Sequence, residues 1–262
     1  MDIFEEIVKL KNEGIPAALV TIIKTKGSTP REVGAKMIIA GDGTARGTIG
    51  GGCVEGQVWD EAKEVIKNGK VKILEFDLLD DALEGEGQAC GGWMQVLIEP
   101  VAVPDTAIIL GAGHISLNLG ILFNMLGFRL VIADDRDEYA SAERFPEADE
   151  IIVSEFENLF EKLKITDNTY IVIVTRGHKY DRMMLEKSLR TNACYVGMIG
   201  SRAKLKALFD SMKSQGFDDK DIKRVHSPIG IPIHSETPEE IAVSIAAEII
   251  KFKKELHGKA KK

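Results

Sequence analysis

The chain has 262 residues, of which 44% are hydrophobic and 29% charged, and its formal net charge is −7. This length suits one large or two ordinary globular domains. The negative charge argues against nucleic acid or an anionic membrane as the main partner, and no apolar run approaches the roughly 20 residues that cross a bilayer. The acidic, amphipathic start is unlike a secretory signal. Because the three cysteines, Cys53, Cys90 and Cys194, form no paired framework, we expect a reduced, cytoplasmic protein.

The first part of the chain, residues 1–99, is predicted to form a small α+β domain. Asp2 can cap an amphipathic helix that ends at Gly14. A second helix is expected from about residue 53 to residue 67. Alternating apolar patterns and turn residues predict strands at 17–23, 36–40, 46–49, 71–77 and 94–98. An acidic segment, 78–86, precedes the last of these strands, and the proline-bounded stretch 100–105 is predicted to be a linker.

Three consecutive glycines are the most informative feature of this domain. Gly50, Gly51 and Gly52 stand between a strand and a helix, where they expose backbone N–H groups and lack side chains that would block a ligand. Cys53 follows at the expected helix start, where the helix dipole stabilises a thiolate. Cys90 also stands beside glycines. Two interpretations stay open: a loop that faces an anion or cofactor, or a plain tight turn with Cys53 as a small buried residue.

Residues 107–135 have the pattern of a dinucleotide-binding βαβ unit: strand, glycine turn, helix, strand and acid. Gly111 permits the tight turn, and Gly113 lets the backbone approach a pyrophosphate at the positive helix end. Asp134 or Asp135 lies where a ribose-binding carboxylate is expected. A fold of this type can nevertheless be used for another ligand.

The rest of the chain alternates strands and helices, as in a doubly wound parallel sheet. We therefore predict a Rossmann-like domain over residues 106–256 and a basic tail over 257–262. The third fingerprint position is Ser116 rather than Gly or Ala, which predicts slightly looser packing of the first helix. Strands are expected at 151–153, 170–175 and 193–196, and helices at 141–145, 156–163, 183–189, around Leu205 and Leu208, and at 239–256.

Ligands of such sheets bind beyond the carboxyl ends of the strands. A pairing of His178 with Asp181 would orient the imidazole, and Arg202 can hold a phosphate or carboxylate in a bidentate fork. The opposing interpretation makes His114, His178 and Arg202 ordinary loop or surface residues. The candidate ligand residues of this domain are Gly111, Gly113, His114, Asp134, Arg176, His178, Gly200, Ser201 and Arg202.

Several motifs together resemble the XdhC/CoxI family, the maturation factors of molybdenum hydroxylases such as xanthine dehydrogenase. The motifs are GSTPR (27–31), GTIGGGCVE (47–55), CGG (90–92), GAGH (111–114), DDR (134–136), RFP (144–146), TRGH (175–178), GMIGSR (197–202) and SPIGIPI (227–233). The resemblance runs from about residue 1 to residue 252.

The resemblance implies a chaperone rather than an enzyme with turnover of its own. It implies binding of the molybdenum cofactor, as molybdopterin or its dinucleotide form, with a cysteine desulfurase and the hydroxylase apoenzyme as partners, and a homodimer. Cys53 or Cys90 would lie near the molybdenum, for which a thiolate has affinity; no zinc-type site is expected. Two alternatives stay open from the βαβ unit: an NAD(P)- or flavin-dependent oxidoreductase, and a nucleotide-binding regulatory scaffold.

Overall fold

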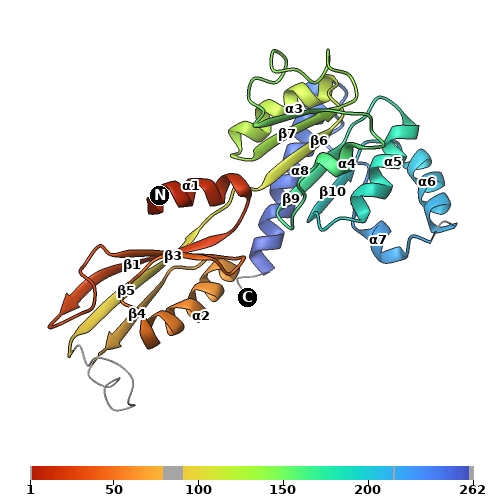
Figure 1. Cartoon of the computed structure of the whole chain (residues 1–262). Coiled ribbons are helices and arrows are strands. Elements are labelled where there is room, and N and C mark those ends of the chain that lie inside the picture. The colour runs from red at the N-terminus through yellow and green to blue at the C-terminus, as the bar shows by residue number, and fades with distance from the viewer. Residues whose placement is uncertain (1, 79–90, 215, 260–262) are drawn as a thin grey trace. The chain divides into compact units, whose positions relative to one another are not determined.

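The computed structural model describes residues 2–78, 91–214 and 216–259 (Figure 1). The acidic segment from residue 79 onward, Cys90 and the end of the basic tail therefore lie outside the described residues. The chain divides into two compact units, residues 1–103 and 104–262. The first two residues of the expected linker still belong to a strand, because Pro100 and Val101 pair with Ala18 and Ala17.

The first unit is a five-stranded antiparallel sheet with a helix on each face. The strand order is β3-β2-β1-β5-β4. Alternate residues of β1 point to opposite faces, so that Val20 packs in the core beneath α2 and Ala17 in the smaller core beneath α1. The elements are α1 (Ile3–Glu13), β1 (Ala17–Lys26), β2 (Lys36–Ala40), β3 (Ala45–Gly47), α2 (Gly52–Asn68), β4 (Lys72–Asp77) and β5 (Trp93–Val101).

The second unit is a six-stranded sheet in which every pairing is parallel, in the order β11-β10-β9-β6-β7-β8. This confirms the predicted Rossmann-like, doubly wound domain. Helices α3 and α8 pack on one face of the sheet, and α4, α5 and α6 pack on the other. The elements are β6 (Thr106–Leu110), α3 (His114–Met125), β7 (Arg129–Asp134), β8 (Glu150–Val153), α4 (Leu159–Lys162), β9 (Thr169–Ile173), α5 (His178–Leu189), β10 (Tyr195–Met198), α6 (Arg202–Ser214), α7 (Asp219–Lys223), β11 (Val225–His226) and α8 (Pro238–Lys259).

Some element boundaries differ from the sequence predictions. The prediction of a helix at 141–145 is wrong, because this stretch forms hydrogen-bonded turns. Where a helix was expected at 156–163, only the single turn of α4 forms. Helix α5 begins at His178, five residues before the expected start at Met183. Ser116 is fully buried and its hydroxyl donates to the Gly111 carbonyl, so this residue ties α3 to the glycine turn.

The strand order reverses at the carboxyl ends of β6 and β9. The chain begins the sheet at β6, continues outward through β7 and β8, and then returns to the other side of β6 with β9 and β10. The strand order reverses at this point, which is where open α/β sheets bind ligands. Over the described ranges, no helix has both the length and the apolarity needed to span a membrane.

Candidate functional site at the carboxyl edge of the parallel sheet

The turn after β6 requires glycine at residue 111. Gly111 has a φ of 108°, and a Cβ atom added there would lie 2.5 Å from the carbonyl oxygen of Val174. Its own N–H donates to the Ala133 carbonyl at 2.7 Å. The turn is therefore wedged between the ends of β7 and β9, and a side chain would push these strands apart.

Gly113, by contrast, borders open space. It is the N-cap of α3, with a φ of −79°, and an added Cβ would meet no atom within 4 Å. The first N–H groups of a helix have no partner within the helix, and the helix dipole makes this end positive. His114 is the first residue of α3 and is exposed. The start of α3 can therefore receive an anionic group.

Asp134 stabilises the glycine turn through a hydrogen bond to its backbone. It is 1% exposed; its Oδ2 accepts the Ala112 N–H at 2.7 Å, and its Oδ1 accepts Arg136 Nε at 2.9 Å. Burial acts to raise the pKa of Asp134, but the hydrogen bonds from Arg136 and Ala112 outweigh it and hold the pKa below its ordinary value. The carboxylate expected to face a ribose is thus bonded within the domain.

Asp135, the other ribose candidate, also has a partner. Arg176 donates to it bidentately, with Nη1–Oδ1 and Nη2–Oδ2 distances of 2.8 and 2.6 Å. Asp135 follows β7 and Arg176 follows β9, and β6 lies between these two strands. The ion pair therefore spans the end of β6, beside the glycine turn, and Arg176 lies at the edge where the sequence predicts it.

A cluster of two arginines and a tyrosine secures the loop after β7. Arg144 Nη1 donates to the Ala112 carbonyl at 3.1 Å. The Tyr139 ring lies against both guanidinium groups, with its centroid 3.7 Å from Arg136 Cζ and 4.8 Å from Arg144 Cζ. Arg136, Tyr139 and Arg144 were not expected as site residues. Arg136 and Arg144 belong to the DDR and RFP motifs, whereas Tyr139 lies in neither motif.

The ends of β9 and β10 bring the remaining predicted residues to the same edge. Thr175 Oγ1 donates to Asp181 Oδ1 at 2.6 Å, and Asp181 is 7% exposed. His178 and Arg202 begin α5 and α6; their side chains lie outside the described part, so the expected pairing of His178 with Asp181 stays a prediction. Gly200 and the exposed Ser201 lead from β10 into α6.

In the first unit, the glycine triplet already holds a carboxylate. Gly50, Gly51 and Gly52 all have positive φ angles, of 140°, 77° and 65°. Glu55 Oε1 accepts the Gly51 N–H at 3.0 Å and the Ile49 N–H at 3.1 Å. At least one of the backbone N–H groups that were expected to face an external anion, that of Gly51, is thus bonded to the chain's own carboxylate.

The same carboxylate accepts the Thr48 hydroxyl at 2.6 Å. Burial acts to raise the pKa of Glu55, but these hydrogen bonds outweigh it and lower the pKa. Cys53 is the second residue of α2, as expected, although its side chain is not described. An added Cβ at Gly51 or Gly52 would meet no atom within 4 Å, so the loop still borders open space there.

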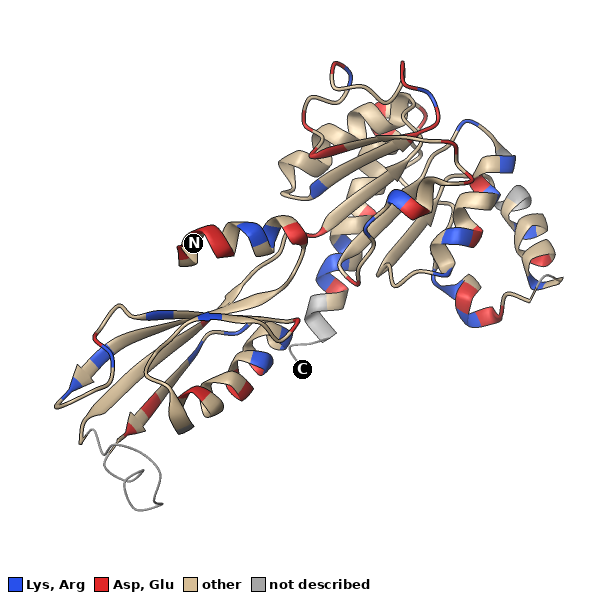
Figure 2. Ribbon diagram, viewed as in Figure 1, with Lys and Arg blue, Asp and Glu red and all other residues tan. Residues whose placement is uncertain are grey.

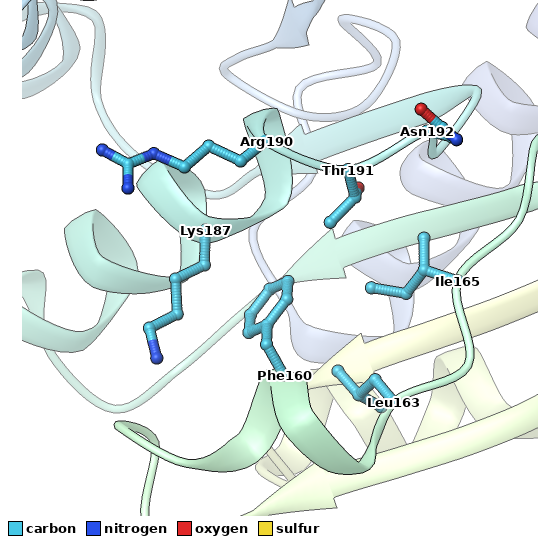
Figure 3. Close-up of a pocket in the computed structure, with 7 residues that line it drawn as sticks. All are labelled: Phe160, Leu163, Ile165, Lys187, Arg190, Thr191 and Asn192. Atoms are coloured by element: carbon cyan, nitrogen blue, oxygen red, sulfur yellow. The ribbon is translucent and has the colours of Figure 1, made fainter.

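A separate pocket of about 480 Å³ lies at the amino ends of strands β9 and β10 of the parallel sheet (Figure 3). Its lining comes from the segments that lead into β9 and β10, and it combines Phe160 and Leu163 with the cations Lys187 and Arg190. It contains none of the predicted site residues. Across the described residues, no three His, Cys, Asp or Glu side chains gather as a metal site.

Comparison with known families decides the affiliation of the chain. The model of the XdhC Rossmann domain matches residues 107–249, and the model of the XdhC and CoxI family matches residues 10–77. The chain belongs to the XdhC/CoxI family. The first match contains every element from the glycine turn to the middle of α8.

Three curated relatives of this XdhC/CoxI chain are informative. YqeB of Escherichia coli (strain K12) is 32% identical over 259 residues, which are 98% of this chain but 47% of YqeB, so the chain spans about half the length of that relative. A protein of Bacillus subtilis (strain 168) named as a probable xanthine dehydrogenase subunit is 23% identical, over 91% of this chain and 93% of that protein. The "Molybdenum cofactor insertion chaperone PaoD" of E. coli (strain K12) is 22% identical, over 90% and 83%.

The crystal structure of a xanthine dehydrogenase from Bacillus halodurans shares the fold of this XdhC/CoxI chain. The TM-score is 0.53, with 24% identity over 97% of this chain and 96% of that chain.

Proposed function

We propose that this chain is a maturation factor that binds the molybdenum cofactor and assists its sulfuration and its insertion into a molybdenum hydroxylase of the xanthine dehydrogenase class. The observation that carries the proposal is the open, positive start of α3 at Gly113, at the strand-order reversal of an XdhC Rossmann domain. A relative named as a molybdenum cofactor insertion chaperone supports the insertion role.

The residues present fit an anionic pterin. The space that a Gly113 Cβ would fill is free for a phosphate or pyrophosphate, which the N–H groups of α3 would hold. Gly200, Ser201 and Arg202 would complete the anion site from the end of β10. A cysteine thiolate is a soft ligand with affinity for molybdenum, and Cys53 follows the glycine triplet of the first unit. The cofactor, when bound, supplies the metal centre on which the client hydroxylase depends.

A nicotinamide- or flavin-dependent oxidoreductase has less support. Ribose recognition in such enzymes uses a carboxylate at the end of the second strand. Both carboxylates at that place have partners: Asp134 binds Ala112 and Arg136, and Asp135 binds Arg176. A ribose would have to displace a bidentate ion pair or a buried hydrogen-bond network.

Transfer to a client tests the maturation role. The purified protein is loaded with molybdenum cofactor, with or without a cysteine desulfurase and cysteine, and mixed with cofactor-free xanthine dehydrogenase apoenzyme. We expect hydroxylase activity to appear faster than with free cofactor, and to rise further when the desulfurase is present. Equal activation with free cofactor, or with bovine serum albumin in place of the protein, would contradict the role.

A further inference from the structure

The pocket at the amino ends of β9 and β10 combines an apolar wall with a cationic rim. Phe160, Leu163 and Ile165 form the wall, and all three are partly buried against the core of this face. Lys187 and Arg190, from the end of α5, form the rim. In Figure 3 the Lys187 chain lies on one side of the Phe160 ring, and Leu163 and Ile165 lie on the other. The volume of about 480 Å³ is within the range of pockets that hold small molecules.

The two cations of the rim have no acidic counterpart. Lys187 and Arg190 are three residues apart, so they are neighbours on the surface of α5 and repel each other. The lining contains no acid, and within the described ranges of the chain neither side chain forms an ion pair. Instead, Lys187 Nζ donates to the Glu157 carbonyl, and Arg190 Cζ lies 5.6 Å from the centroid of the Phe217 ring.

The end of α5 compensates only part of this charge. The carbonyl end of a helix is equivalent to roughly half a negative charge, against two positive charges here. Other cations of this unit have carboxylate partners: Arg182 Nε lies 2.8 Å from Glu186 on the same helix, and Lys213 Nζ lies 2.7 Å from Asp219. On α7 acids and bases alternate, as the red and blue bands in Figure 2 show. In a chain with a net charge of −7, the rim is therefore a local positive site that an anion would stabilise.

We propose that this pocket binds a small aromatic anion, in which a flat ring carries a carboxylate or a phosphate. The ring packs against Phe160, which offers an offset-stacked or edge-to-face contact, and Leu163 and Ile165 shield it from water. The anionic group lies between Lys187 and Arg190. The guanidinium of Arg190 can donate two parallel hydrogen bonds to a carboxylate or to a phosphate.

The remaining lining residues add one polar group for the ring. Thr191 Oγ1 already donates to the Ser188 carbonyl at 2.6 Å, whereas the Asn192 side chain is exposed and lies apart from the two cations in Figure 3. An amide both donates and accepts hydrogen bonds, so a ring with a polar edge would gain a partner there. The candidate cofactor site lies at the opposite ends of the same strands, so this inference does not depend on the proposed function.

Isothermal titration calorimetry with matched ligands tests the inference. The probes are 2-naphthoate and adenosine monophosphate; their counterparts are 2-naphthalenemethanol and adenosine, which lack the charge, and inorganic phosphate, which lacks the ring. We expect at least one of the two aromatic anions to bind with a dissociation constant below about 1 mM. It should bind at least about tenfold more tightly than its uncharged counterpart and than phosphate. Binding of 2-naphthoate alone would identify a carboxylate ligand, and binding of the nucleotide alone a phosphate ligand.

Substitutions locate the binding in this pocket. Lys187→Gln and Arg190→Gln each remove one charge of the rim and should weaken binding at least about fivefold. Phe160→Leu keeps the wall apolar but removes the ring, and should weaken binding about threefold. Arg182→Gln, on the same helix but outside the lining, is the control and should bind as wild type does. Failure of both aromatic anions to bind below about 1 mM, equally tight binding of phosphate, or an affinity that survives the double substitution of Lys187 and Arg190 would overturn the proposal.

Discussion

Arg176 and Asp135 form a bidentate ion pair that joins the ends of β9 and β7 across the intervening end of β6. Asp135 is well buried, with 7% side-chain exposure, while Arg176 is 38% exposed. The pair fixes the spacing of the two loops on either side of the glycine turn. It also sets how freely Arg176 can turn toward an incoming anion.

We expect this ion pair to be energetically coupled. A double-mutant cycle with Asp135→Asn and Arg176→Gln, measured by urea unfolding, should give a coupling free energy of about 1 kcal/mol, because the geometry is bidentate and one partner is shielded. The pair Lys213–Asp219, with side chains 49% and 72% exposed, serves as the control and should couple less. Equal coupling in the two pairs would show that the bridge does not hold the loops.

The two glycines of the turn should respond differently to the same substitution. Gly111→Ala forces a side chain against the Val174 carbonyl at a positive φ, so we expect it to lower the free energy of unfolding by about 3 kcal/mol. Gly113→Ala adds a methyl group to open space at a negative φ and should change stability by less than about 1 kcal/mol. Similar losses for both variants in chemical denaturation would argue against this turn geometry.

Glu55 should make the stability of the first unit depend on pH. Its pKa is lowered in the folded state, so the stabilisation is fully present above its ordinary pKa of about 4.3 and disappears as the pH falls through the depressed value. Glu55→Gln should cost about 1–2 kcal/mol at neutral pH, through weakened bonds to Thr48, Ile49 and Gly51. The difference between wild type and variant should shrink below about pH 4; a difference that stays constant down to pH 3 would contradict this.

Cys194 should be an unreactive thiol. Burial raises its pKa to about 12, and its Sγ donates to the Thr169 carbonyl at 3.3 Å. At pH 8, N-ethylmaleimide should modify it at least about a hundredfold more slowly than the same cysteine in urea-unfolded protein, because the thiolate is the reactive form. Peptide mass spectrometry after timed labelling measures both rates, and rapid labelling of Cys194 in the native protein would contradict the burial.

Much of the fold could be predicted because its signals are local. The strand, glycine turn, helix and acid of residues 107–135 specify the βαβ unit, and the capping motif at Thr237 specifies the start of α8. The start of α5 could not be predicted in this way. His178 to Arg182 show no apolar periodicity, and the helix begins there because Gly177 caps it after β9.

The location of the candidate site could be predicted better than the roles of its residues. Asp134 has the spacing of a ribose ligand, but only the tertiary structure brings Arg136 and the Ala112 N–H to it. Likewise, the glycine triplet predicts free N–H groups, and Glu55, one helical turn later, binds two N–H groups of that loop. The physical reason is the same in both places: a carboxylate near backbone N–H donors can bind them within the chain, so the donors' presence in the sequence does not by itself say whether they are left to a ligand.

Binding of the cofactor at the start of α3 is the central claim, and the pterin content of three proteins tests it most directly. Wild type, Gly113→Val and Gly120→Ala are incubated with molybdenum cofactor and separated from free ligand, and the bound pterin is measured by its fluorescence after oxidation. Gly113→Val fills the open space in front of the helix, whereas the Cβ of Gly120→Ala, in the same helix, would make an ordinary 3.4 Å contact with Leu130. We predict near-stoichiometric binding for wild type and Gly120→Ala and at least about a tenfold loss of affinity for Gly113→Val; equal binding by all three, or none by wild type, would contradict the claim.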